Sequence, residues 1–130
     1  SGPSSISQKA AEAAYTGSQD CVEEMRLAFE RRKNLITRLL KEIPDLKVND
    51  PKGAFYTFVE CSRYLGKVFG EKRIDTATDL AMFLLEEGHV ACVGGDAFGA
   101  PGHLRFSYAT SDEKIEAAIS RVKEALKKLR

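Results

Sequence analysis

The chain has 130 residues, enough for one ordinary domain that buries its own core. Apolar residues make up 43% of it and charged residues 30%, which is typical of a globular chain and not of a disordered or membrane-spanning one. The formal net charge is +1 at pH 7, so composition gives no reason to expect binding to nucleic acid or to a membrane surface.

The cysteines indicate a reducing environment. Cys21, Cys61 and Cys92 are an odd number, lie far apart in sequence, and form neither a metal-ligand spacing nor a disulfide framework. We therefore expect a cytoplasmic location. The chain opens on Ser1 and not on Met, so we expect its N-terminus to come from processing, proteolysis or deliberate truncation.

The first half of the chain predicts two helices. A short Ala-rich helix is expected over about residues 7–15. A second, long helix follows, with Asp20 as N-cap, Glu23 completing a capping box and Pro44 ending it. Apolar residues recur along one face of this helix and are expected to point inward: Val22, Met25, Phe29, Ile36, Leu40 and Ile43.

The second half alternates strands and helices. Residues 54–60 have the aromatic and β-branched content of a strand, whereas residues 64–72 predict a loop with a helical turn. A helix capped by Asp75 or Thr76 should end at Gly88. Beyond it the sequence predicts a strand at 89–93, a glycine-rich loop, a strand at 104–109, and a final helix capped by Ser111.

These elements predict an α+β fold. Three or four short strands should form a small mixed sheet, covered on one face by helices. The first twenty residues could be an appendage that packs elsewhere, and residues 21–130 would then form the compact unit.

Arg105 is the residue most suited to binding. In the last strand Leu104, Phe106 and Tyr108 alternate with His103, Arg105 and Ser107, so Arg105 should face away from the apolar side. An arginine there is either a surface residue or a site for an anion, because its planar fork matches a carboxylate. The glycines before it fit no nucleotide-binding spacing and predict a tight structural loop.

The segment VGGDAFGAPGHLRFSYATS (Val93–Ser111) resembles the C-terminal signature of class I aminotransferases of the aspartate aminotransferase family. Residues 51–58 (PKGAFYTF) are similar to the family's Gly-x-Phe-Tyr strand entry, and residues 20–38 look like the helix that links its two domains. The signature residues present in register are Gly95, Phe98, Gly99, Gly102, Arg105, Ser107, Tyr108 and Ala109.

The resemblance implies a fold of the aspartate aminotransferase small-domain type at residues 21–130, with residues 1–20 continuing from a large domain. It implies that Arg105 grips the substrate α-carboxylate and that Phe55 lies near the substrate pocket, although the aromatic residue type favours core packing for Phe55. It further implies amino acid and 2-oxo acid substrates and a homodimeric parent enzyme.

Pyridoxal phosphate is the cofactor that the resemblance implies for the parent. In the family the cofactor lysine directly follows a Ser-x-Ser motif. Here Ser5-Ile6-Ser7 is followed by Gln8, so Lys9 does not match the cofactor lysine. We therefore expect no cofactor-binding or catalytic residue in this chain, no bound cofactor and no activity of the chain alone. His89 and His103 predict no metal site.

The sequence thus predicts the C-terminal part of an aminotransferase, acting on aspartate in the parent. Two alternatives stay open: an aminotransferase for aromatic or other amino acids, and a non-catalytic α+β interaction module.

Overall fold

The strands β2 (Tyr56–Glu60) and β6 (His103–Ser107) form the centre of the sheet in the computed structural model, which describes residues 2–130. β1 (Lys47–Val48) pairs with β2, and β5 (Val93–Gly94) pairs with β6, so the order is β1-β2-β6-β5. The helices of the described residues are α1 (Ser5–Thr16), α2 (Asp20–Lys41), α3 (Ala77–Gly88) and α4 (Asp112–Leu126).

The predicted α+β class and the small four-stranded sheet are confirmed, but the sheet is antiparallel and not mixed. The short connections explain this difference for the two outer pairs of strands. β1 reaches β2 through residues 49–55, and β5 reaches β6 through residues 95–102. Links of that length reverse the chain, whereas a parallel pair needs a crossover of about a dozen residues or more.

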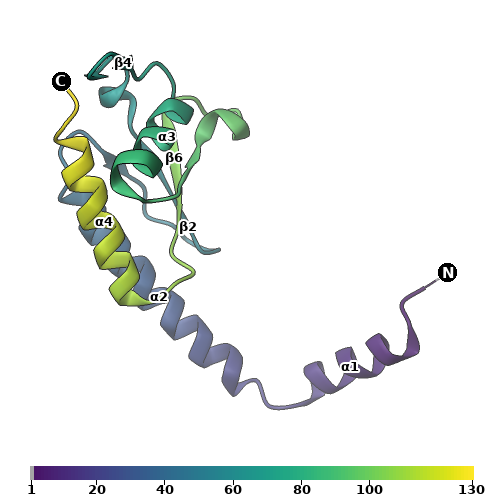
Figure 1. The fold of residues 1–130 in the computed structure, drawn as a ribbon. Coiled ribbons are helices and arrows are strands. Elements are labelled where there is room, and N and C mark those ends of the chain that lie inside the picture. Colours follow the sequence, from purple (N-terminus) through teal and green to yellow (C-terminus); the bar gives the residue numbers. More distant parts are fainter. Residues whose placement is uncertain (1) are drawn as a thin grey trace.

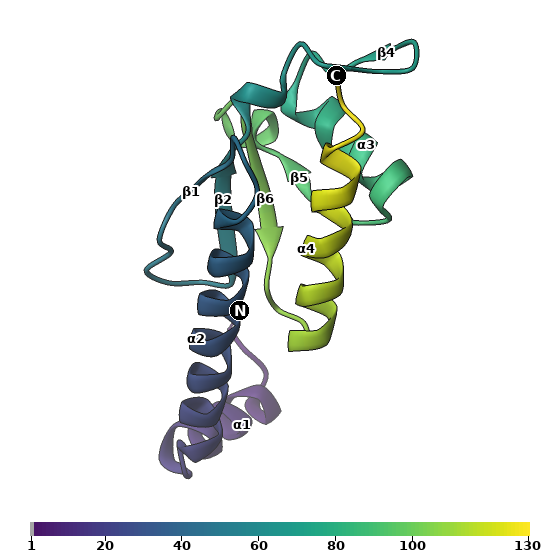
Figure 2. The ribbon, with the colours of Figure 1, turned by 90° about the vertical axis from the view of Figure 1, so that its left-hand side faces the viewer.

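The helices cover one face of the sheet, as predicted. Thr57, Val59, Leu104 and Phe106 alternate along β2 and β6, and each is at most 3% exposed. Val59, Leu104 and Phe106 share one hydrophobic core with residues of three helices, among them Ile36, Leu40, Leu80, Leu84, Ile115, Ile119 and Val122. Figure 2 shows α2 and α4 side by side in front of the strands. The opposite face, carrying Phe58 and Arg105, is left open.

The predicted strand at 89–93 is wrong over most of its length. His89 ends α3 in a left-handed conformation with φ of 53°, and the Val90 N–H donates to the Leu84 carbonyl at 3.1 Å. These residues therefore belong to the end of the helix, and pairing with β6 begins only at Val93. The helix caps at Thr76 and Ser111 are confirmed.

Three very short strands were not predicted. β1 is one of them, and the other two are β3 (Val68–Phe69) and β4 (Lys72–Arg73), which form a separate hairpin within the predicted loop. Strands of two residues carry no periodicity that a sequence could reveal. A helical turn is present just before the hairpin, the 3₁₀ turn η1 (Ser62–Tyr64), but it shares only Tyr64 with the predicted range.

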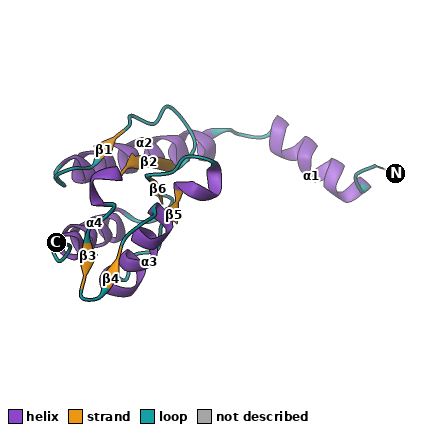
Figure 3. Ribbon diagram, turned by 90° about the horizontal axis from the view of Figure 1, so that it is seen from above, coloured by secondary structure: helices purple, strands orange, loops and turns teal. Residues whose placement is uncertain are grey.

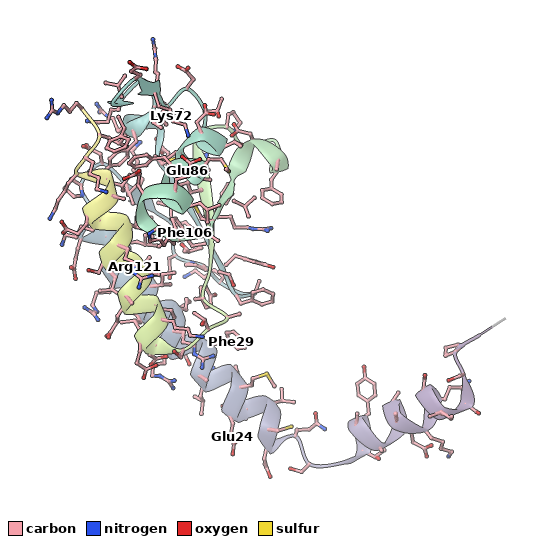
Figure 4. All side chains as sticks on the ribbon, in the orientation of Figure 1. Glu24, Phe29, Lys72, Glu86, Phe106 and Arg121 are labelled. Carbon is pink, nitrogen blue, oxygen red and sulfur yellow. The ribbon has the colours of Figure 1, made fainter. Side chains whose placement is uncertain are left out.

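The first helix and the first turns of α2 project away from the sheet (Figures 1 and 3). None of the residues of α1 is buried, and Val22 and Met25 of α2 are each 54% exposed, although the helical stripe predicted that they point inward. In Figure 4, Glu24 lies on this projecting part, whereas Phe29 lies where α2 reaches the body.

The predicted cap at Asp20 is also wrong. Gln19 occupies the N-cap position, and Asp20 is the first helical residue, with its carboxylate accepting a hydrogen bond from the Ser18 hydroxyl at 2.6 Å. Glu23 pairs with Arg26 at 2.8 Å instead of closing a capping box. The start of α2 thus relies on the helix dipole, which favours Asp20 and Glu23 in the first turn.

Candidate functional site

Arg105 lies in the middle of β6 on the open face of the sheet. Its strand neighbours Leu104 and Phe106 are 1% and 3% exposed and point into the core, while Arg105 itself is half-buried. This placement is the one that the alternation predicted. On either side of β6, Phe58 of β2 and Val93 of β5 lie opposite Arg105 in the ladder.

Two aromatic rings lie against the Arg105 guanidinium. Its central carbon is 4.4 Å from the centre of the Tyr56 ring and 4.2 Å from the centre of the Phe98 ring. Tyr56 comes from β2, and Phe98 comes from the 3₁₀ turn η2 (Gly95–Phe98) that follows β5 on the other side of β6. We call Tyr56, Arg105 and Phe98 the Arg105 stack.

The charge of Arg105 has no acidic partner within residues 2–130, where none of the ion pairs or side-chain hydrogen bonds involves it. Glu60, an acid on the same open face, is occupied elsewhere: it accepts from Ser62 at 2.7 Å and pairs with Lys47 at 3.0 Å. These two contacts lower the pKa of Glu60, so it stays ionised and compensated. Arg105 therefore keeps its N–H donors for an external acceptor.

The turn that carries Phe98 is fastened to the start of α3. One carboxylate oxygen of Asp96 accepts from both the backbone N–H and the hydroxyl of Thr78, each at 3.0 Å. Side chains at Gly94 and Gly95 would not fit, because a Cβ would lie 2.6 Å from the Thr78 hydroxyl and 2.3 Å from the Ala100 carbonyl, respectively. The glycines are thus packing residues, in agreement with the tight structural loop predicted from their spacing.

Phe55 lies at the end of the Arg105 stack. Its ring is 4.3 Å from that of Tyr56 and 6.2 Å from that of Phe29, and the residue is 39% exposed. The core packing that its residue type favoured is therefore wrong for the chain as described. Phe55 lies beside the surface on which Arg105 lies, and its contact with substrate stays a prediction.

Tyr56 and Phe98 were not identified from the sequence as residues of the site. Tyr56 could have been, because it shares the period-two face of β2 that lies beside Arg105. Phe98 ends the short 3₁₀ turn η2, and no local pattern predicts which way its ring points.

A cavity of about 460 Å³ lies between α2 and the loop before β2, but Arg105 is not among its lining residues. Arg26, on its wall, is already paired with Glu23 and Glu30. Among the described residues, the sheet therefore lies beneath the Arg105 stack, and no pocket encloses it.

The residues around Arg105 do not by themselves fit pyridoxal phosphate. Tyr56, Phe58, Val93 and Phe98 offer neither an amine nor cationic groups for a phosphate. Lys9 is on the projecting helix α1, with its side chain 81% exposed and paired with Glu12 at 2.6 Å. No step of a reaction through the cofactor can be assigned to these side chains.

The histidines have structural contacts. His103 stacks on Phe58 with ring centres 5.0 Å apart, and its Nδ1 lies 3.0 Å from the Pro101 carbonyl, whereas His89 ends α3. Within residues 2–130 there is no group of three or more His, Cys, Asp or Glu side chains placed to hold a metal ion. In the same residues, no helix has the length and apolar character needed to cross a membrane.

The family model and the similar proteins agree on one family. The family described as aminotransferase class I and II matches residues 1–122. An aspartate aminotransferase from Rhizobium meliloti (strain 1021) is 46% identical over 128 residues, which are 98% of this chain and 31% of that protein. A probable aspartate/prephenate aminotransferase from Aquifex aeolicus is 46% identical over 112 residues, 86% of this chain and 27% of that protein.

Solved structures that resemble this chain are aminotransferases as well. The crystal structure of the aspartate aminotransferase from Rhizobium meliloti superposes with a TM-score of 0.93 at 45% identity, covering 100% of this chain and 33% of that one. An aromatic aminotransferase from Pyrococcus horikoshii gives a TM-score of 0.72 at 37% identity, covering 83% and 27%. The chain thus spans about a third of the length of the proteins that it matches.

Proposed function

Because the chain belongs to the class I and II aminotransferases, we propose that it is the C-terminal part of a pyridoxal-phosphate-dependent enzyme and binds the substrate α-carboxylate through Arg105. The observation that carries this proposal is a half-buried arginine with two supporting rings and no acidic partner among the described residues. A carboxylate would accept two parallel N–H donors from the guanidinium. Amino acids and 2-oxo acids share this group, so one arginine can serve both halves of an amino-group transfer.

The rest of the site is proposed to come from outside this chain. Bound in the parent enzyme, pyridoxal phosphate would supply the electron-withdrawing chemistry that labilises the bonds of an amino acid. The open face around Arg105 would then be enclosed by a large domain, to which residues 1–20 belong, while residues 21–130 form the small domain. Exposed apolar side chains on α1, with Ile6 82% and Tyr15 87% exposed, support a packing partner for this segment.

We propose aspartate as the amino donor, because several of the relatives are named aspartate aminotransferases. Prephenate or aromatic substrates are the second candidate, since other relatives carry those names. Family membership favours both over a non-catalytic interaction module. A homodimeric parent in the cytoplasm completes the proposal, and the free thiols of Cys21, Cys61 and Cys92 are consistent with that compartment.

The test uses the full-length protein that contains this chain. Amino-group transfer from aspartate and from phenylalanine is measured separately, for the wild type and for Arg105→Ala. We expect transfer from aspartate to be the more efficient, and we expect the variant to lose efficiency with both donors, because both present the same carboxylate. An Arg105→Ala enzyme that transfers amino groups as efficiently as the wild type would disprove the assignment of Arg105.

A further inference from the structure

Phe98 is placed in an unusual way for a phenylalanine. It is 49% exposed, so about half of its surface stays in contact with solvent. Its ring centre nevertheless lies 4.2 Å from the guanidinium carbon of Arg105. The attraction between a cation and the face of an aromatic ring accounts for this contact, and Tyr56 makes the same kind of contact at 4.4 Å.

The backbone around Phe98 is fixed before any substrate arrives. Asp96, two residues earlier in η2, is bound by two donors of Thr78 in the first turn of α3. Gly94 and Gly95 allow that turn to approach α3 and the Ala100 carbonyl closely. Tyr56 is fixed as well, since it lies within β2 and is paired in register with Ser107 of β6. Both rings are therefore supported by regular structure on either side of Arg105.

Rings against a guanidinium have a directional effect. The N–H donors of arginine lie in the plane of the group, whereas aromatic rings contact its face. Rings stacked on that face would leave the donor edge free and restrict rotation about the last side-chain bonds of Arg105. The arginine then loses less conformational freedom when it binds a planar, two-oxygen acceptor.

We propose that Tyr56 and Phe98 are positioning residues, which orient the Arg105 guanidinium for the substrate carboxylate and act through Arg105 without touching the substrate. The inference rests on the proposed function of Arg105. It gives the turn at residues 95–98 a part in substrate binding, in addition to the close packing that its glycine allows.

The experiment compares Phe98→Leu and Tyr56→Leu with wild type in the full-length enzyme, in both the amino acid and the oxo acid half-reactions. Each variant should raise KM about threefold to fivefold, as expected for one exposed cation–ring contact, while kcat changes by less than about twofold. Phe98→Tyr, which keeps a ring, should restore most of the lost affinity. Since the two rings come from different elements, one variant still tests the proposal if the other fails to fold.

Phe69→Leu is the matched control. It also removes a ring near a cation, the Lys128 ammonium at 5.9 Å, but lies in the β3–β4 hairpin and should leave both KM values unchanged. A second arm repeats Phe98→Leu in an Arg105→Lys background. If Phe98 acts through Arg105, its loss there should change KM by less than about twofold, because coupled residues are not additive.

The outcomes separate the two proposals. If Arg105→Lys is as efficient as wild type, the proposed function of Arg105 fails. If Arg105→Lys is impaired while Phe98→Leu and Tyr56→Leu behave like Phe69→Leu, only the positioning inference is wrong. An undiminished effect of Phe98→Leu in the Arg105→Lys background would mean that Phe98 contacts the substrate directly, and this would overturn the inference too.

Discussion

The Tyr108 hydroxyl donates to the Ala54 carbonyl at 3.0 Å, and the Tyr108 N–H donates to the Phe55 carbonyl at 2.9 Å. This pair of bonds joins the chain after β6 to the chain before β2, next to the Arg105 stack. Ala54 has φ of 58°, a left-handed conformation that is strained for alanine, so the Tyr108 contact helps to hold a turn that local preference disfavours.

Tyr108→Phe should therefore lower the free energy of unfolding of the chain by about 1 kcal/mol, the usual net value of such a hydrogen bond. Urea denaturation followed by circular dichroism measures it. Tyr15→Phe, at a residue 87% exposed on α1, is the control and should leave the midpoint unchanged. Equal midpoints for Tyr108→Phe and wild type would mean that the Ala54 turn is stable without the hydroxyl.

Arg105→Lys in the full-length enzyme should reduce kcat/KM about tenfold to a hundredfold in both half-reactions, because an ammonium cannot reproduce two parallel bonds to a carboxylate. Arg105→Ala should be worse, since no cation remains. Cofactor absorbance should be unchanged in both variants, because the guanidinium is assigned to the substrate and not to pyridoxal phosphate. A loss confined to one half-reaction would contradict a clamp for the shared carboxylate.

The 130-residue chain alone, incubated with pyridoxal phosphate, should develop no stable cofactor absorbance band and should catalyse no transfer. The reason is that the Lys9 side chain is 81% exposed and paired with Glu12, and that the described residues do not enclose the Arg105 stack. The measurement is an absorbance spectrum after removal of free cofactor. A stable band that Lys9→Ala abolishes would place the cofactor lysine in this chain, against our interpretation.

The cap of α3 predicts a pH dependence of stability. Hydrogen bonds from the Thr76 hydroxyl and N–H lower the pKa of Asp79 below its ordinary value of 3.8. Because the folded-state pKa is the lower one, this contribution is present above pH 3.8 and is lost as the pH falls further, through the lowered pKa. Asp79→Asn should thus lose less stability than wild type when the pH falls below 3.8. The measurement is the fall in the thermal unfolding temperature of each protein on acidification. Glu116→Gln on α4 serves as control and should follow the wild-type curve.

The thiols should differ in reactivity. Burial raises the pKa of Cys61 and of Cys92 to about 12, whereas Cys21 is exposed. Thiolates react and thiols do not, so iodoacetamide at about pH 8 should modify Cys21 alone in the folded chain and all three cysteines in denaturant. Mass spectrometry of the intact chain counts the additions. Rapid labelling of Cys61 without denaturant would contradict the fold around β2.

The sequence predicted those elements in which the local pattern and the tertiary packing agree. Alternation over β6 predicted the direction of Arg105 because each residue of a strand faces opposite to the next. The stripe on α2 predicted Ile36 and Leu40 as buried, which is confirmed, but failed at Val22 and Met25. An apolar stripe predicts which side of a helix is buried. It does not predict how many turns of that side are packed against other residues of this chain.

The candidate site was predicted only in part, for a similar reason. Arg105 could be identified from its strand and from the family resemblance. Its contact with Phe98 depends on where α3 places Asp96, and that is decided by packing between residues distant in sequence. No reading of residues 95–99 alone could orient that ring.

The continuity of α2 has a mechanical consequence. Its 22 residues form one unbroken helix, about 33 Å long, whose last turns are embedded in the core at Ile36 and Leu40 while its first turns stand clear of it. Such a helix is a rigid connection between its two ends. If the proposed large domain holds the first turns of α2, a change in the tilt of this helix would carry the sheet with it, and Arg105 would move toward or away from a bound carboxylate without changing its own rotamer.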